Sequence, residues 1–256
     1  MILPDKKDAI HKVWLYRVLE AVADDSFLSH TLYFKGGTCA AMLGWLPRFS
    51  VDLDFDYAGE VSEQEINKTR LVFENVFQKL GLTVKDWSKK GLQYFLKYPL
   101  SSGTNKISAI LPVVRNTLKV DASFPLFKSS KYESRRFAEI DRVLTCQTKE
   151  TMFAHKLVTP LDRFEKTGGI AGRDIFDIHH FFLSGFSYDA AIISERRGRN
   201  AKEFLLELHD FIKQRVTDSV ITEDLSFLLP PKEFARLRKV LKREVLSLLK
   251  EEMEKE

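Results

Sequence analysis

The sequence has few of the features that mark membrane, secreted or disulfide-stabilised proteins. Its 256 residues include only two cysteines, Cys39 and Cys146, which are too few for a disulfide scaffold. No apolar run approaches the ~20 residues that a membrane-spanning helix requires, and residues 1–12 lack the apolar core of a signal peptide. We therefore expect a cytoplasmic protein without a membrane partner.

A strong excess of charge of one sign is also missing. The 40 Lys and Arg residues nearly balance the 36 Asp and Glu residues, which leaves a formal net charge of +4. This balance permits a polyanionic partner, such as a nucleotide or RNA, without requiring one. The chain has no internal repeat and no low-complexity segment, and its 44% hydrophobic residues are sufficient for a substantial core.

The first 147 residues combine helical and β patterns. Apolar residues at helical spacing predict helices over residues 5–23 and 62–80. The β-rich runs are residues 31–35, 51–57, 82–87, 93–98, 107–114, 118–124 and 140–146. A polar stretch, residues 128–136, separates the last run from the others. These patterns indicate one sheet with flanking helices.

From residue 149 onward the pattern is helical. Residues 232–256 carry a heptad-like apolar stripe that is too short to predict a coiled coil. We therefore predict an α+β fold with two domains. Residues 1–147 would contain the sheet, and residues 148–256 would form a mostly helical domain that completes the active-site cleft.

The clearest pattern is the alternation of residues 51–57, which places acidic side chains on one face of a strand and apolar side chains on the other. Asp52 and Asp54 are two residues apart, so their carboxylates can share one divalent cation. Mg²⁺ suits such oxygen ligands, and no spacing of Cys or His predicts a zinc site. An acidic strand taken alone is more often a solvated face.

A second pattern places a phosphate-binding turn before that strand. Residues 36–38 have the sequence Gly-Gly-Thr, at a predicted turn from strand to helix. Glycine lets the backbone approach a phosphate closely, and N–H groups at a helix start carry partial positive charge. Together with Asp52 and Asp54, this turn offers a nucleoside triphosphate a backbone cradle and a metal. Asp121 is a candidate third carboxylate for a two-metal site.

These motifs resemble the nucleotidyltransferase motif of the AbiEii/AbiGii toxin family, a group of DNA-polymerase-β-like nucleotidyltransferases. The family pattern is a GG(T/S) turn, a short helix and an R-x-S-x-D-(I/L)-D strand. The matching positions are Gly36, Gly37, Thr38, Arg48, Ser50, Asp52 and Asp54. The family's later motifs, E-x-x-x-x-K-L, R and R-D-x-x-D, are similar to the segments that hold Lys156, Arg163, Arg173, Asp174 and Asp177.

The resemblance implies both a fold and an activity. The fold would be the mixed sheet of a nucleotidyltransferase, flanked by helices and followed by a mostly helical C-terminal region. The activity would be transfer of a nucleoside monophosphate from an NTP to an acceptor hydroxyl, with Mg²⁺ or Mn²⁺ as the cofactor. The MenT branch of the family modifies the 3′ end of tRNA, so tRNA is the implied acceptor, and a cognate antitoxin is an implied partner.

A candidate site follows from the resemblance and the chemistry together. The expected metal ligands are Asp52, Asp54 and Asp121. The expected catalytic residues are Asp52, Asp54, Lys156, Asp174 and Asp177. The expected nucleotide-binding residues are Gly36, Gly37, Thr38, Arg48, Ser50, Lys156, Arg163 and Arg173. Asp174 and Asp177 share a helix face. One of them would orient Lys156 or receive the proton of the attacking hydroxyl, and the other would be a structural salt-bridge partner; the sequence does not distinguish which is which.

Other interpretations remain open at this point. The motifs define neither the preferred NTP nor the acceptor, so the same chemistry could modify a protein or a small molecule such as an aminoglycoside. A catalytically silent member would only bind a nucleotide or an antitoxin. Asp56 lies on the same predicted face as the metal pair without a defined role. The basic runs 196–199 and 239–243 are either solvated or in contact with a phosphate backbone.

Overall fold

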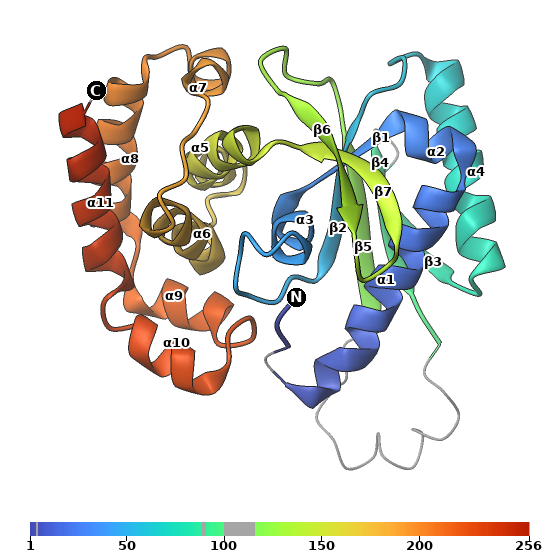
Figure 1. Ribbon diagram of the computed structural model, residues 1–256, viewed down its shortest axis with the longest axis horizontal. Coiled ribbons are helices and arrows are strands. Elements are labelled where there is room, and N and C mark those ends of the chain that lie inside the picture. The colour runs from blue at the N-terminus through green and yellow to red at the C-terminus, as the bar shows by residue number, and fades with distance from the viewer. Residues whose placement is uncertain (4, 89–90, 100–115, 256) are drawn as a thin grey trace.

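The structure is a computed structural model that describes residues 1–3, 5–88, 91–99 and 116–255. Within these residues, seven strands form one mixed sheet at the centre of the N-terminal part of the chain (Figure 1). In order across the sheet, the strands are β3 (Thr83–Trp87), β4 (Leu92–Lys97), β5 (Thr117–Ser123), β2 (Asp52–Tyr57), β1 (Leu32–Lys35), β7 (Arg142–Gln147) and β6 (Tyr132–Phe137).

Helices cover both faces of this sheet. The short helix η1 (Lys6–Asp8), α1 (Ala9–Asp24), α2 (Ser26–Thr31) and α4 (Glu63–Lys79) lie on one side, and α3 (Gly36–Met42) lies on the other (Figure 1). The predicted α+β fold, a mixed sheet flanked by helices, is therefore confirmed. Among the described helices, none is long and apolar enough to cross a membrane.

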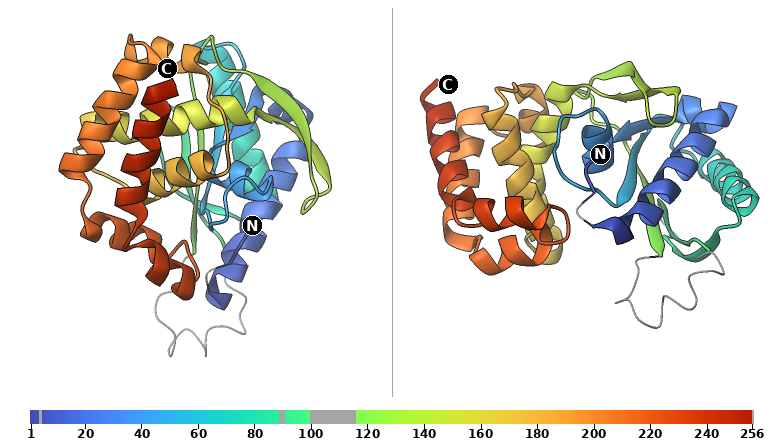
Figure 2. Two further views of the ribbon diagram at one scale, coloured as in Figure 1. Left: turned by 60° about the vertical axis from the view of Figure 1, so that its left-hand side comes forward. Right: turned by 60° about the horizontal axis from the view of Figure 1, so that its bottom comes forward.

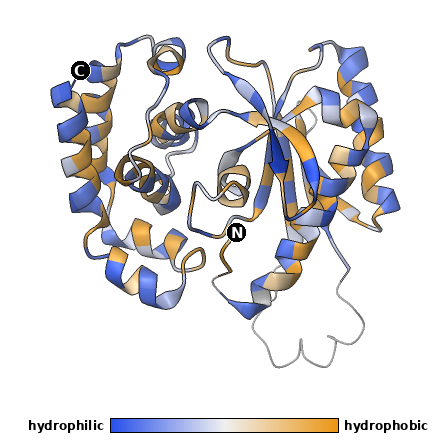
Figure 3. Ribbon diagram, in the orientation of Figure 1, coloured by the Kyte–Doolittle hydropathy of each residue, from blue (hydrophilic) through white to orange (hydrophobic). Residues whose placement is uncertain are grey.

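The C-terminal helices all lie on the α3 side of the sheet (Figure 1). They are α5 (Lys149–Thr167), α6 (Gly172–Leu183), α7 (Ala190–Arg197), α8 (Ala201–Arg215), α9 (Asp218–Leu225), α10 (Pro231–Leu237) and α11 (Leu241–Lys255). Apolar and polar residues alternate around α8 and α11 (Figure 3), as expected of helices with one buried face. The apolar stripe of the tail is part of the core, because Leu241, Val245 and Leu249 are buried where α11 packs on α6 and α8.

The central strand β2 organises the sheet. It pairs antiparallel with β1 and parallel with β5, so Asp54 lies directly opposite Lys35 on one side and Asp121 on the other. Directly opposite residues on neighbouring strands point to the same face of a sheet. The backbone pairing thus gathers charged residues from three strands on one face.

The alternation of residues 51–57 has the predicted consequence. Leu53, Phe55 and Tyr57 are at most 1% exposed and belong to the core. The three aspartates between them, Asp52, Asp54 and Asp56, point to the opposite face, which is the face that carries α3. Burial of the apolar face therefore fixes which way the carboxylates point.

The polar stretch 128–136 was expected to separate β-rich runs, but most of it forms the edge strand β6, paired antiparallel with β7. Its charged, largely exposed side chains are typical of an edge strand, which must avoid pairing with other chains. The expected strand at 107–114 lies outside the described residues. The division into two domains near residue 147 stays a prediction, although the last strand ends at Gln147 and α5 begins at Lys149.

Candidate active site

A cavity of about 990 Å³ is lined by the acidic face of the sheet and by helices α5 and α6. Most of the predicted site residues line it. These residues are Gly36, Gly37, Arg48, Ser50, Asp52, Asp54, Lys156, Arg163, Arg173 and Asp174. The fold therefore brings together side chains from two segments that are about a hundred residues apart in sequence. Thr38, Asp121 and Asp177 do not line the cavity, and each has another position described below.

The turn between β1 and α3 admits only glycine. Gly36 has a φ of +78°, and a Cβ at this residue would lie 2.5 Å from Oδ2 of Asp54. A Cβ at Gly37 would lie 2.8 Å from Oγ of Ser50 and 2.9 Å from a guanidinium nitrogen of Arg48. The backbone at the start of α3 therefore packs directly against the acidic strand, an approach that a side chain at either residue would obstruct.

We predict that Gly36→Ala will lower nucleotidyl transfer by about tenfold or more, because the new methyl group must displace the Asp54 carboxylate. Gly44→Ala is the matched control. Gly44 has a similar φ of +73°, but nothing lies within 4 Å of its would-be Cβ. Both variants should lose about 1–2 kcal/mol of unfolding free energy from the left-handed backbone, and only Gly36→Ala should lose activity in a steady-state assay. Equal activities in the two variants would contradict the contact.

The carboxylate of Asp54 lines the cavity. Among the described residues, none donates a hydrogen bond to its carboxylate or forms an ion pair with it. Burial raises the pKa of Asp54, although the positive charges of Lys119 and Lys35 oppose this effect. A carboxylate of this kind has room for a cation, and a divalent ion would favour its ionised form.

The donor set fits Mg²⁺ in its chemistry. Asp52 and Asp54 offer carboxylate oxygens from one strand face, and this ion commonly takes one or two carboxylates with water and substrate phosphates. In the part of the chain that the structure describes, no three His, Cys, Asp or Glu side chains are grouped so that they could hold a metal. The predicted third ligand, Asp121, instead accepts hydrogen bonds from Nε2 of Gln93 and Nζ of Lys119, each at 2.7 Å.

Two other predicted nucleotide-binding residues, Thr38 and Ser50, lie at or behind the cavity wall. Thr38 is fully buried and donates a hydrogen bond from its hydroxyl to the backbone carbonyl of Asp52. This bond anchors α3 to β2, so the Thr38 hydroxyl does not face the cavity as the sequence motif suggested. Ser50 does line the cavity, although it is largely buried.

A buried ion-pair cluster joins the two halves of the candidate site. Arg48 is 2% exposed and donates from Nε and Nη2 to the carboxylate of Asp177 at 2.5 and 2.7 Å. Lys156 lies with its Nζ 2.7 Å from Oδ2 of the same Asp177. Burial would raise the pKa of Asp177, but the charges of Arg48 and Lys156 lower it to about 2. Asp177 is therefore the residue that orients Lys156, a question that the sequence left open.

Asp174 has a different partner from Asp177. Its carboxylate accepts a hydrogen bond from Nε of Arg163 at 2.8 Å, and Arg173 pairs with Asp224 at 2.7 Å. These pairs leave both arginines at the cavity wall with part of their charge neutralised. Asp224, from the end of α9, lay outside every motif, and no local signal in the sequence identifies it.

The structure assigns a position to Asp56, whose role the sequence left undefined. Its buried carboxylate is 2.6 Å from Nζ of Lys35 and accepts hydrogen bonds from the Tyr132 hydroxyl and the Gln147 amide, at 2.9 and 2.7 Å. Asp56 therefore ties β2 to β1, β6 and β7 at the wall of the cavity, which it also lines. Sequence reasoning missed Lys35 and Lys119, which line the cavity. Their positions beside Gly36 and two residues before Asp121 were the available signal.

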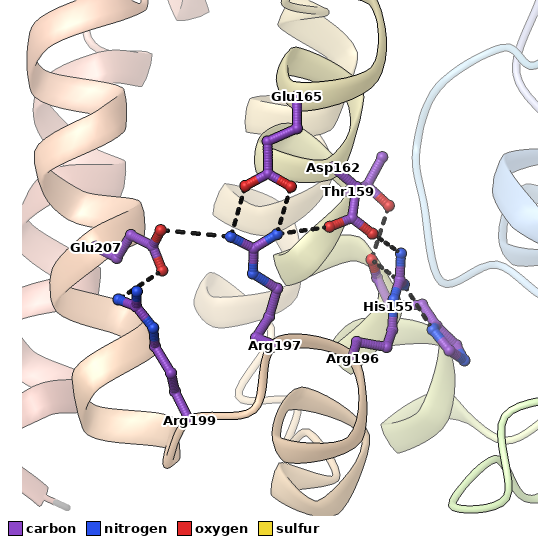
Figure 4. Close-up of polar contacts among 8 residues, drawn as sticks. All are labelled: His155, Thr159, Asp162, Glu165, Arg196, Arg197, Arg199 and Glu207. Atoms are coloured by element: carbon purple, nitrogen blue, oxygen red, sulfur yellow. Dashed lines mark hydrogen bonds and ion pairs between the residues drawn. The ribbon is translucent and has the colours of Figure 1, made fainter.

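Two of the three arginines of the basic run 196–199 are largely buried in ion pairs, and the third, Arg199, is 51% exposed. Arg196 and Arg197 are 13% and 12% exposed, and both pair with Asp162 on α5 (Figure 4). Arg197 also reaches Glu165 and Glu207, and Glu207 pairs in turn with Arg199. The run is thus a charge network that joins α5, α7 and α8.

His155 connects this network to the cavity wall. Its Nδ1 is 2.8 Å from Nη1 of Arg196, and its Nε2 is 2.9 Å from the Ser130 hydroxyl. Burial and then the charge of Arg196 lower the pKa of His155 to about 3, so the imidazole is neutral near pH 7. A neutral ring accepts the hydrogen bond from Arg196 at Nδ1 and donates from Nε2 to Ser130.

Comparison with known proteins identifies a family for this chain. The family model described as "Nucleotidyl transferase AbiEii toxin, Type IV TA system" matches residues 17–243. The chain belongs to this AbiEii family. Its resemblance to the AbiEii toxins is thereby confirmed, and the chain is a nucleotidyltransferase of a toxin–antitoxin family, for which an NTP is the substrate and an antitoxin the partner.

The fold of this AbiEii chain has solved counterparts in Helicobacter pylori. One is JHP933, with a TM-score of 0.51 and 16% identity over 98% of this chain and 96% of that one. Another is described as a "putative nucleotidyltransferase", with a TM-score of 0.52 and 17% identity over 96% of this chain and 98% of that one. At these identities the likeness concerns the fold alone. No curated protein matches the sequence.

Proposed function

We propose that this AbiEii chain uses Mg²⁺ to transfer a nucleoside monophosphate from an NTP to the 3′ end of tRNA. The observation that carries the proposal is the Asp54 carboxylate, which has no hydrogen-bonding partner among the described residues and lies against the glycine turn at Gly36. A triphosphate there would find backbone N–H groups on one side and the ammonium group of Lys156 on the other.

The remaining walls of the cavity suit the phosphates and the base of the NTP and the end of the tRNA strand. Lys35, Lys119 and Arg163 line it and offer positive charge to phosphate oxygens. Phe127 and Phe227 also line it, and Phe227 is 62% exposed. Exposed aromatic rings are common platforms for stacking a nucleobase. These features support a cavity that holds a nucleotide together with the end of a nucleic-acid strand.

The proposed reaction needs little covalent chemistry from the protein. A bond forms between the acceptor oxygen and the α-phosphorus, and the bond from that phosphorus to the pyrophosphate oxygen breaks. The metal, held by Asp52 and Asp54, would neutralise charge on the phosphate oxygens. Lys156, held in place by Asp177, provides further positive charge. Asp174 and Asp177 are both committed to ion pairs, so we assign neither as the acceptor of the hydroxyl proton, which passes to solvent water as the oxygen bonds to phosphorus.

The proposal includes the setting in which the enzyme acts. A tRNA substrate requires a cytoplasmic enzyme, and the antitoxin expected for the family would restrain transfer until it is lost. Mn²⁺ would serve in place of Mg²⁺, because both prefer oxygen ligands.

The deciding experiment is to incubate the purified protein and Mg²⁺ with each of the four α-³²P-labelled NTPs, with total RNA or with protein extract as the acceptor. We expect label in a band of tRNA size from one preferred NTP, and no label with the Asp54→Ala variant. Label on protein instead of RNA would show that the acceptor is a protein and not tRNA. Absence of label from both would leave a small-molecule acceptor or a silent nucleotide-binding module.

A further inference from the structure

The two basic runs of the C-terminal half, residues 196–199 and 239–243, differ in whether acidic side chains pair with them. The charges of residues 196–199 are neutralised by acidic partners, as Figure 4 shows. The run 239–243 instead lies at the start of α11, where it contributes to a second concave surface of about 460 Å³. Helices α8 and α11 run side by side there, at the end of the molecule away from the sheet (Figures 1 and 2).

This surface, the α8–α11 groove, is lined by six basic side chains and by one apolar side chain, Leu246. The basic side chains are His209, Lys213, Lys239, Lys242, Arg243 and Lys250. On α11, Arg243, Leu246 and Lys250 are three or four residues apart, so they follow one face of the helix. From Arg243 to Lys250 this row extends about 10 Å along the helix axis.

The charges of the groove lack counter-charges. Among the described residues, no Asp or Glu forms an ion pair with any of its five Lys and Arg side chains. Lys242 alone is anchored, because its Nζ donates to the backbone carbonyls of Lys213 and Val216, at 3.0 and 2.7 Å, at the end of α8. Lys213, Lys239, Arg243 and Lys250 are exposed. Concave surfaces lined by one sign of charge focus the field and attract ions of the opposite sign.

We propose that the α8–α11 groove binds the phosphate backbone of an RNA, at a distance from the reacting 3′ end. The inference rests on the proposed function for its choice of RNA as the macromolecule. Side chains of Lys and Arg on one face are typical of backbone contacts that position a nucleic acid without reading its sequence. A protein partner would require an apolar interface core, and Leu246 alone does not provide one. The groove would therefore hold the body of the acceptor while its end enters the cavity.

The test compares two triple variants of the full chain that remove equal charge. The groove variant is Lys213→Gln, Arg243→Gln and Lys250→Gln, which leaves the helix-anchoring Lys242 intact. The control variant is Lys79→Gln, Lys85→Gln and Lys97→Gln, exposed lysines of α4, β3 and β4 that form no ion pair within the described residues. Fluorescence anisotropy measures the binding of labelled tRNA at several salt concentrations, and circular dichroism checks that both variants fold.

We expect the groove variant to bind tRNA about tenfold more weakly near physiological salt, with a slope of log K against log salt that is smaller by about 2. The control variant should behave as the parent does. In transfer assays the groove variant should raise KM for tRNA and leave kcat unchanged. A short single-stranded oligonucleotide with the same 3′ sequence, too short to reach the groove, should show no change in KM.

Equal tRNA affinity of the groove and control variants would overturn the proposal. Loss of antitoxin binding without loss of tRNA binding would also overturn it and would assign the groove to an acidic protein. The Asp54→Asn variant, which keeps the groove, separates this inference from the proposed function. If tRNA binds through the groove but neither the parent nor the variants transfer a nucleotide to it, RNA binding by the groove is supported and the assignment of tRNA as the acceptor is wrong.

Discussion

We expect the Asp54→Asn variant to lose nucleotidyl transfer by about 10³-fold or more, because asparagine keeps the shape of the side chain but not the charge that holds a divalent cation. Its unfolding free energy should equal or exceed that of the parent. The carboxylate has no hydrogen-bonding partner among the described residues, and burial raises its pKa, so its ionised form is unfavourable in the folded protein. Removing that charge should therefore maintain or raise the unfolding free energy while it abolishes nucleotidyl transfer.

Metal binding gives this prediction a readout that does not depend on activity. A cation that binds only the folded protein raises its melting temperature, so Mg²⁺ should raise the Tm of the parent and leave that of Asp54→Asn unchanged. Asp86→Asn, which changes an exposed aspartate of β3, is the matched control and should retain both activity and the Mg²⁺ effect. Transfer at the parental rate by Asp54→Asn would refute the assignment of this carboxylate.

The Asp177→Asn variant should lose about 3–5 kcal/mol of unfolding free energy, because it leaves the buried Arg48 guanidinium without its counter-charge. The loss should depend on pH. The pKa of Asp177 lies at about 2 in the folded protein, below the usual value. Its contribution is therefore complete above about pH 4 and declines as the pH falls toward 2. Urea unfolding at pH 7 and pH 3 measures both quantities.

Asp141→Asn is the matched control for this buried pair. Asp141 also pairs with an arginine, Arg136, but both side chains are about 70% exposed, so solvent already screens their attraction. Its φ of 50° is one that asparagine adopts readily. We expect little change in stability from this control. A similarly small change in Asp177→Asn would show that Arg48 and Lys156 find other partners, and would remove Asp177 as the group that positions Lys156.

Several parts of the fold were predictable because the signal was local. The alternation of residues 51–57 and the two glycines before them specify a strand, its buried face and a tight turn. The edge strand β6 was missed because its polar residues give no such alternation, and only its pairing with β7 makes it a strand. Local patterns identify elements that bury one face, but they do not identify strands whose role is to cover an edge.

In the candidate site, too, some features were predictable from the local sequence and others depended on the tertiary structure. The sequence by itself identified the family, the α+β fold, and the glycines and aspartates around which the cavity forms, because those residues are close neighbours along the chain. Only the tertiary structure decided that Asp177 orients Lys156, that Asp56 ties the strands together, and that Thr38 faces the core. It also decided that the basic run 196–199 pairs with acidic side chains, whereas the run 239–243 forms no ion pair within the described residues. These outcomes depend on which side chains meet when separate elements pack together: α5 on α6 for Lys156 and Asp177, the neighbouring strands of the sheet for Asp56, and α3 on β2 for Thr38.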